Sequence, residues 1–143
     1  MGTSYDNDVV AWANEQAALL RSGQLSAIDI ENIAEEILDV GKSEQRELTN
    51  RMAVLLAHLI KWQFQPERRC KSWSNTVKHQ RKSINLHLKK VPSLKPKLAD
   101  NEWQEAIWAD ALVIAERETD LDDFPEECLW TIEDILSSDW LPA

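Results

Sequence analysis

The chain has 143 residues, of which 43% are hydrophobic and 29% charged, and its formal net charge is −9. This balance is typical of a globular protein with one core and excludes an intrinsically disordered chain. The longest apolar run, residues 53–60, contains His58 and ends at Lys61, which is far short of the ~18 residues that a membrane span needs.

Helix breakers are scarce, with 3 Gly and 5 Pro, and they fall between segments whose apolar residues recur at helical spacing. The first predicted helix runs from Asp6 to Arg21 and ends through Gly23, because glycine favours the left-handed exit of a helix. The apolar residues that we expect to face inward are Val9, Trp12, Ala13, Leu19 and Leu20.

A second helix is predicted to open at Ser26, because Ser26 and Asp29 have the spacing of a capping box. Its expected inward positions before Gly41 are Ile30, Ile33, Ile37 and Leu38. After Gly41 the pattern resumes in alternating steps of four and three until Pro66, at Leu48, Met52, Leu55, Leu59 and Trp62.

The length of this second helix raises a problem of its own. Unbroken from Ala27 to Gln65, it would measure about 58 Å, whereas a compact domain of this size has a radius of gyration of about 14 Å. We therefore predict a kink near Gly41. A helix that overhangs instead would require a partner subunit to cover its apolar stripe.

The carboxyl-terminal half is predicted to be helical as well. A third helix, capped by Ser72 and stopped by Pro92, has a stripe of Trp73, Val77, Ile84, Leu88 and Val91. Another runs at least from residue 103 to 119, with Pro96 in or before its first turn. Thr131 opens a short helix to about residue 136. The predicted fold is an all-α, single-domain bundle of about four to five helices over residues 1–143.

Basic residues are concentrated between Lys61 and Lys97, where eleven lysines and arginines accompany one acid, Glu67. This segment carries +10, so the rest of the chain carries −19. A wheel of the third helix places four lysines in one arc opposite the apolar stripe: Lys71, Lys78, Lys82 and Lys89. Such a face can bind an acidic partner or phosphates. A solvated helix whose charge is neutralised by acidic neighbours has the same pattern.

We predict that this segment binds a partner without a catalytic or metal-binding role. The candidate binding residues are Lys61, Arg68, Arg69, Lys71, Trp73, Lys78, Lys82 and Lys89.

No spacing required for catalysis or cofactor binding is present. The sequence lacks a G-x-S-x-G turn, a glycine-rich phosphate loop and an H-E-x-x-H pair, and Cys70 and Cys128 form no C-x-x-C motif. With no export signal at the amino end, we expect a cytoplasmic protein with reduced thiols and neither metal nor cofactor. His58 is expected to be half-buried and satisfied by a carboxylate, for which the candidates are Glu35, Glu36 and Glu47.

Several blocks of sequence carry a resemblance to a known family. They are Tyr5-Asp6, Ala11–Arg21, Glu31–Ile37, Gly41–Glu44, Leu56–Arg69 and Phe124–Cys128. Over nearly its whole length the chain resembles the domain-of-unknown-function family numbered twenty-nine, most specifically from Lys61 to Trp73. Leu129 departs from that pattern, in which a proline usually follows the cysteine. The resemblance implies a short, helical bacterial protein, of a kind common in cyanobacteria, and brings no activity, cofactor or catalytic residue.

These observations support three hypotheses of function. The first is a non-enzymatic module that binds another protein, or a second copy, through the Lys61–Lys97 segment or the acidic, Trp-containing carboxyl tail. The second is a nucleic-acid-associated protein that uses the same segment, with Trp62 or Trp73 as stacking groups. The third is an enzyme that combines His58 with Glu35 or Glu36 and with Arg68 or Arg69.

Overall fold

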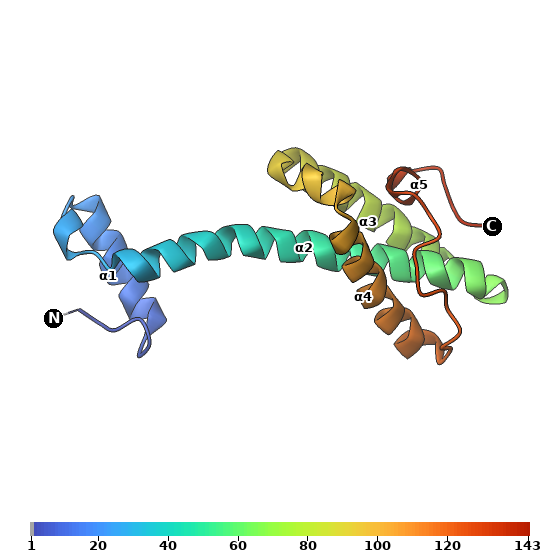
Figure 1. Ribbon diagram of the computed structural model, residues 1–143, viewed down its shortest axis with the longest axis horizontal. Helices are drawn as coiled ribbons and strands as arrows, with labels where there is room; N and C mark the ends of the chain where they lie inside the picture. Colours follow the sequence, from blue (N-terminus) through green and yellow to red (C-terminus); the bar gives the residue numbers. More distant parts are fainter. Residues whose placement is uncertain (1) are drawn as a thin grey trace. The chain divides into compact units, whose positions relative to one another are not determined.

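The computed structural model describes residues 2–143, and within them it contains five α-helices, three 3-10 helices and no strand (Figure 1). The α-helices are α1 (Val9–Arg21), α2 (Ile30–Phe64), α3 (Lys71–Lys90), α4 (Asn101–Thr119) and α5 (Ile132–Leu136). The 3-10 helices are η1 (Leu25–Ala27), η2 (Pro66–Arg68) and η3 (Pro92–Ala99). The predicted all-α bundle with one long helix is confirmed.

The helices group into two compact units, of which the first ends at Glu44 and the second comprises Gln45–Ala143. The helix α2 contributes its first part to the first unit and the remainder to the second. The single-domain organisation stays a prediction.

In the first unit, α1 is capped at both ends by local hydrogen bonds. The Asp8 side chain accepts a hydrogen bond from the amide of Ala11 at 3.1 Å. At the other end Gly23 has φ +75°, and the amide of Gln24 donates to the carbonyl of Leu19 at 2.9 Å. This is the Schellman arrangement, so the predicted left-handed exit at Gly23 is confirmed.

Asp29, and not Ser26, caps the start of α2. Ser26 lies in η1, and the Asp29 carboxylate instead accepts from the amide of Asn32 at 3.3 Å. The Trp12 indole donates to the same carboxylate at 3.0 Å, and the Gln16 side chain accepts from the Asp29 amide at 2.8 Å. The predicted capping box at Ser26 is therefore wrong, because Asp29 has partners on both α1 and α2.

The predicted inward face of the first unit is largely wrong. Trp12 is buried, but most other apolar residues that were expected to face a core are exposed. Their exposed fractions are 48% for Val9, 44% for Leu20, 65% for Ile30, 66% for Ile37 and 58% for Leu38. The reason is that α1 and the start of α2 bury only Trp12 and Gln16 between them.

Gly41 does not end the long helix, and the kink predicted near it stays a prediction. The helix α2 continues through Gly41 as 35 residues without interruption (Figure 1). A glycine inside a helix costs only about 1 kcal/mol relative to alanine, and α2 contains no proline that would remove a backbone hydrogen bond.

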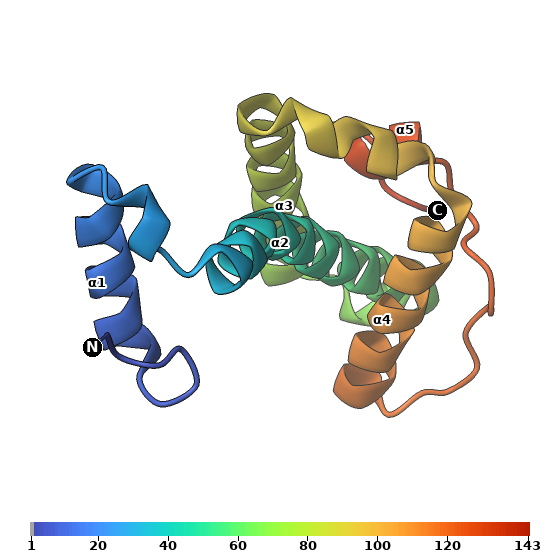
Figure 2. The ribbon, with the colours of Figure 1, turned by 60° about the vertical axis from the view of Figure 1, so that its left-hand side comes forward.

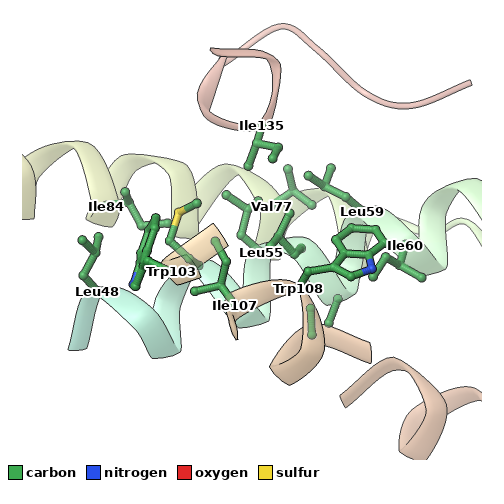
Figure 3. Close-up of a cluster of buried hydrophobic side chains, with 14 of the residues drawn as sticks. Leu48, Leu55, Leu59, Ile60, Val77, Ile84, Trp103, Ile107, Trp108 and Ile135 are labelled. Atoms are coloured by element: carbon green, nitrogen blue, oxygen red, sulfur yellow. The ribbon is translucent and has the colours of Figure 1, made fainter. Parts of the chain in front are cut away.

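In the second unit α2 is the central helix of the core. The ribbons show α3 and α4 beside the second part of α2 (Figures 1 and 2). The close-up shows side chains from α2, α3, α4 and α5 meeting in one cluster (Figure 3). Its fully buried members include Leu48, Leu55, Leu59, Ile60, Val77, Ile84, Ile107, Trp108 and Ile135. The predicted stripes are confirmed at Leu48, Leu55 and Leu59 of α2 and at Val77 and Ile84 of α3.

The start of α3 differs from the prediction. The helix begins at Lys71, shortly after η2 ends at Arg68, and its N-cap is Cys70 in an extended conformation. The Ser72 carbonyl accepts a hydrogen bond from the Thr76 hydroxyl, and the Ser72 side chain does not cap the helix. Pro92 ends the helix as predicted and opens η3, which contains Pro96.

The carboxyl-terminal tail packs on the core of its unit. The Thr131 side chain accepts from the amide of Asp134 at 3.2 Å and so caps α5 as predicted. Trp130 makes edge-to-face contacts with Trp108 and Trp140, each with ring centroids 5.6 Å apart. None of the helices within residues 2–143 is both long and apolar enough to span a membrane.

Candidate interaction surfaces

Four lysines of α3 form what we call the cationic face: Lys71, Lys78, Lys82 and Lys89. All four are exposed, and the opposite side of α3 buries Val77, Ile84 and Leu88 in the core. From the first lysine to the last, the row is about 27 Å long at 1.5 Å per residue. The amphipathic pattern of the sequence therefore places these side chains on the surface of the second unit.

The cationic face is not neutralised by ion pairs within residues 2–143. The ion pairs of this unit join other residues, among them Arg51 with Glu47 at 3.2 Å and Lys61 with Glu118 at 2.6 Å, and His87 lies 3.5 Å from Glu47. Like charges held along one helix without a directly contacting counterion raise the local potential and favour binding of an acidic group.

An exposed leucine lies among these lysines. Leu86 is 58% exposed and follows Lys82 by four residues, so the two share one side of α3. Lys89, three residues further on, lies beyond it on the same side. An apolar side chain surrounded by cations offers a contact that a phosphate backbone does not use but that a protein partner can bury.

Lys61 is not available at the surface. It is 5% exposed, its Nζ donates to the Glu118 carboxylate at 2.6 Å, and it lies 5.0 Å from the centroid of the Trp73 ring. These contacts join α2, α3 and α4, so Lys61 and Trp73 stabilise the packing of the second unit. The structure places both of these predicted binding residues apart from the exposed row.

Of the two arginines after α2, one is engaged in contacts within the chain and the other is exposed. Arg69 is half-buried, donates from Nε to the Trp62 carbonyl at 2.7 Å and lies 5.0 Å from the Trp62 ring. Arg68 is exposed at the end of η2. Because a cation lies over one face of each of the Trp62 and Trp73 rings, a base that stacks on that face would have to displace it.

His58 is half-buried as predicted, but its partner is not a carboxylate. Its Nδ1 lies 2.9 Å from the Val54 carbonyl, one turn earlier on α2, so this nitrogen carries the proton of the neutral ring. Burial lowers the pKa of His58, and the nearby Lys61 lowers it further, while the hydrogen bond to Val54 opposes the shift. The predicted carboxylate partner is wrong because the carbonyl at i−4 is within reach on the same helix.

Two of the three carboxylates considered for His58 have partners of their own. The Tyr5 hydroxyl donates to Glu36, an interaction that raises the pKa of Tyr5 to about 12. Glu47 pairs with Arg51 and lies 3.5 Å from His87. His58 and these two carboxylates therefore contact different partners.

A second titratable group lies in a depression of the surface on α4 and the tail. The depression has a volume of about 540 Å³ and is lined by Trp108, Glu126 and Cys128, among others. The Cys128 thiol donates to the Trp130 carbonyl at 3.3 Å. Cys128 is exposed as a residue, but partial desolvation of its thiol raises the pKa of this group, so the thiol is protonated and a weak nucleophile at neutral pH.

Two features that distinguish the internal cation Lys61 from the exposed lysines were not predicted from the sequence. The first is the burial of Lys61, which the apolar run over residues 53–60, interrupted only by His58, could have indicated, because a helix that is apolar on all sides is a central one. The second is Glu118, which is 57 residues from Lys61 in sequence and had no local signal.

Comparison with protein families matches residues 4–141 to the family described as Domain of unknown function DUF29. The chain belongs to this family. Membership in DUF29 covers both units and confirms the resemblance seen in the sequence. Comparisons with curated proteins and with solved structures give no match.

Proposed function

We propose that this chain is a non-enzymatic protein-interaction module that docks an acidic partner on the cationic face of α3. The observation that carries the proposal is the row of four exposed lysines without ion pairs within residues 2–143. Steering by such a row raises the rate of encounter with an oppositely charged surface and fixes the register of binding.

The position of Leu86 supports a protein as the partner. Binding energy at protein interfaces comes mainly from a few buried anchors, and the surrounding charges supply orientation. Leu86 is the exposed apolar residue of α3 that such a partner could bury. The partner surface should therefore carry carboxylates around an apolar pocket.

The internal contacts of the other cations support the same choice of surface. Lys61 and Arg69 are engaged with Glu118 and the Trp62 carbonyl. Trp130 and Trp140 of the tail contact each other and pack against the core. The acidic tail is therefore the weaker candidate, because its aromatic anchors are already used.

Charge reversal tests the proposal. Tagged wild-type protein and the triple variant Lys78→Glu, Lys82→Glu, Lys89→Glu are used to capture partners from host lysate treated with nuclease. The wild type should retain a stoichiometric protein, and the variant should lose it by more than about tenfold, because each reversed charge turns attraction into repulsion.

The matched control reverses three exposed cations outside α3: Arg46, Lys95 and Arg117. This variant has the same net charge as the first and should retain the partner. Equal loss in both variants would show a net-charge effect and contradict a local docking face. Nucleic acid in the untreated eluate, with no protein after nuclease, would favour the nucleic-acid alternative.

A further inference from the structure

The first part of α2 presents an uncovered apolar strip that does not belong to the cationic face. Ile30, Ala34, Ile37 and Gly41 follow one another in steps of four, three and four residues, so at about 100° per residue they share an arc of about 60°. All four are exposed, with Ile30 at 65% and Ile37 at 66%. We call these four residues the apolar strip.

The charged residues between Ile30 and Gly41 avoid this strip. Glu31, Glu35 and Asp39 lie at least about 80° away from its centre at 100° per residue, and Glu44 follows Gly41 by three residues at the end of the strip. Leu38, which is 58% exposed, flanks the strip about 70° from its centre, and Val40, which is 67% exposed, lies about 90° from the centre on the other side, as far away as Glu31. The apolar surface is therefore continuous across three turns of helix, which is unusual for a surface that faces only water.

The order of large and small residues along the strip is self-complementary. Each isoleucine is followed four residues later by a small residue, Ala34 or Gly41. When two copies of the strip run in opposite directions, Ile30 faces Gly41 of the second copy and Ala34 faces its Ile37. A large side chain then meets a small one at every level, which lets the helices approach closely. A parallel pair would oppose isoleucine to isoleucine and leave a gap between the small residues.

We propose that this strip is a homodimer interface in which α2 pairs antiparallel with α2 of a second copy. A twofold axis requires that if one residue contacts another, the reverse contact also exists, and the spacing of the strip satisfies this condition. Pairing by heptad-like steps of three and four is the geometry of antiparallel helix pairs.

Gly41 provides an independent reason for the pairing. Glycine destabilises a helix interior, and a Cβ at this position would meet no atom within 4 Å in the chain itself. The structure of a single copy therefore gives no steric reason for glycine here. Opposite Ile30 of a second copy, the absence of a side chain makes room for the isoleucine.

The charges at the edge of the strip fit the same arrangement. Lys42 is the one basic residue between Ile30 and Glu44. In the antiparallel pair it lies on the same side as Glu31 of the second copy, within about one turn, at a distance that an ion pair can span. This contact occurs twice by symmetry and favours the antiparallel direction over the parallel one.

Sedimentation velocity over a range of protein concentrations tests the interface. The wild type should shift from monomer to dimer as concentration rises. Ile37→Glu should raise the dissociation constant of the dimer by more than about tenfold, because it buries an unpaired charge at the interface. Since Ile37 is 66% exposed, the helical content of the variant should be unchanged, as circular dichroism would show.

Val113→Glu is the matched control, because Val113 is 54% exposed on α4 in the second unit. This variant should dimerise like the wild type. A wild type that stays monomeric at every concentration would overturn the proposal, as would a dimer that Ile37→Glu leaves intact. Neither result would bear on the cationic face, which is tested by charge reversal on α3.

Disulfide trapping tests the direction of pairing. In a background in which the exposed Cys70 and Cys128 are replaced by serine, one sample carries Ala34→Cys and another Ile37→Cys. An antiparallel pair predicts that the mixture of the two links into dimers faster than either protein alone. Faster linking of each protein with itself would show a parallel pair and contradict the self-complementary strip.

Discussion

Two glycines of the first unit have opposite backbone requirements. Gly23 adopts φ +75° after α1, where an L-residue is strained, whereas Gly41 lies inside α2. A Cβ would meet no atom within 4 Å at either position. The difference between the two sites is therefore one of backbone conformation and helix propensity.

We expect Gly23→Ala to lower the free energy of unfolding by about 1 kcal/mol, because the left-handed conformation disfavours a Cβ. Gly41→Ala should raise it by about 1 kcal/mol through helix propensity. Urea unfolding followed by circular dichroism, at a protein concentration low enough to keep the chain monomeric, measures both. Shifts of the same sign would contradict the backbone assignment at one of the two sites.

His58 should make the stability of the fold depend on pH. Burial lowers its pKa from the usual 6.5, so the folded chain binds fewer protons at this site than the unfolded chain. The contribution of the neutral ring is complete above pH 6.5 and is lost as pH falls through the folded pKa.

The wild type and His58→Gln can be compared by urea unfolding at about pH 7.5 and about pH 5.5, on either side of the reference pKa. The wild type should lose more stability than the variant over this interval. Equal losses would mean that His58 titrates in the folded chain as it does in the unfolded chain.

At the scale of the helix, α5 depends on a side chain from α3. Arg81 is 5% exposed, and its Nε donates to the Ile135 carbonyl at 2.8 Å. That carbonyl is one of the last in α5 and lacks an intrahelical partner. Burial also lowers the pKa of Arg81, so the cation is held where hydration is poor.

We expect Arg81→Ala to lower the free energy of unfolding by about 2 kcal/mol, because it removes a charge-assisted hydrogen bond and leaves the carbonyl buried. The tail should be released first, so limited proteolysis should cut between residues 121 and 143 faster than in the wild type. Lys82→Ala, one residue along and exposed, is the control and should change neither property. An unaltered cleavage rate in Arg81→Ala would contradict this role.

The helices could be predicted from the sequence where an apolar stripe finds its cover within the same unit. The stripe from Leu48 to Leu59 and the face of Val77, Ile84 and Leu88 are buried as expected. In the first unit the same kind of pattern, at Ile30 and Ile37, is exposed. The helical periodicity of apolar residues indicates that one face of a helix tends to be buried. It does not tell whether the same chain or another molecule buries it.

Helix starts were harder to predict than helix ends. Gly23 and Pro92 ended helices as expected, because their backbone restrictions act locally. Ser26 and Ser72 failed as caps because the Asp29 side chain caps α2 and the extended residue Cys70 precedes α3. Asp29 gains its position from Trp12 and Gln16, which are distant in sequence.

For the whole molecule, the basic segment of the sequence contains two groups of residues that the structure places differently. Part of the basic segment is internal, as Lys61 and Arg81 are 5% exposed and hydrogen-bonded within the second unit. The other part is the cationic face, whose four members could be predicted from helical spacing alone. Which basic residues are internal and which belong to the cationic face could not be predicted from the sequence, because this depends on how α2, α3, α4 and α5 pack together.

The reactivity of individual lysines toward an acylating reagent reports whether a partner covers the cationic face of the wild-type chain. The protein is labelled in buffer and in nuclease-treated host lysate, and each lysine is quantified by mass spectrometry. We predict that Lys71, Lys78, Lys82 and Lys89 lose reactivity together in the lysate, while the exposed Lys95 on η3 retains it. Unchanged reactivity of the four lysines, or an equal loss at Lys95, would contradict a docking site on the cationic face.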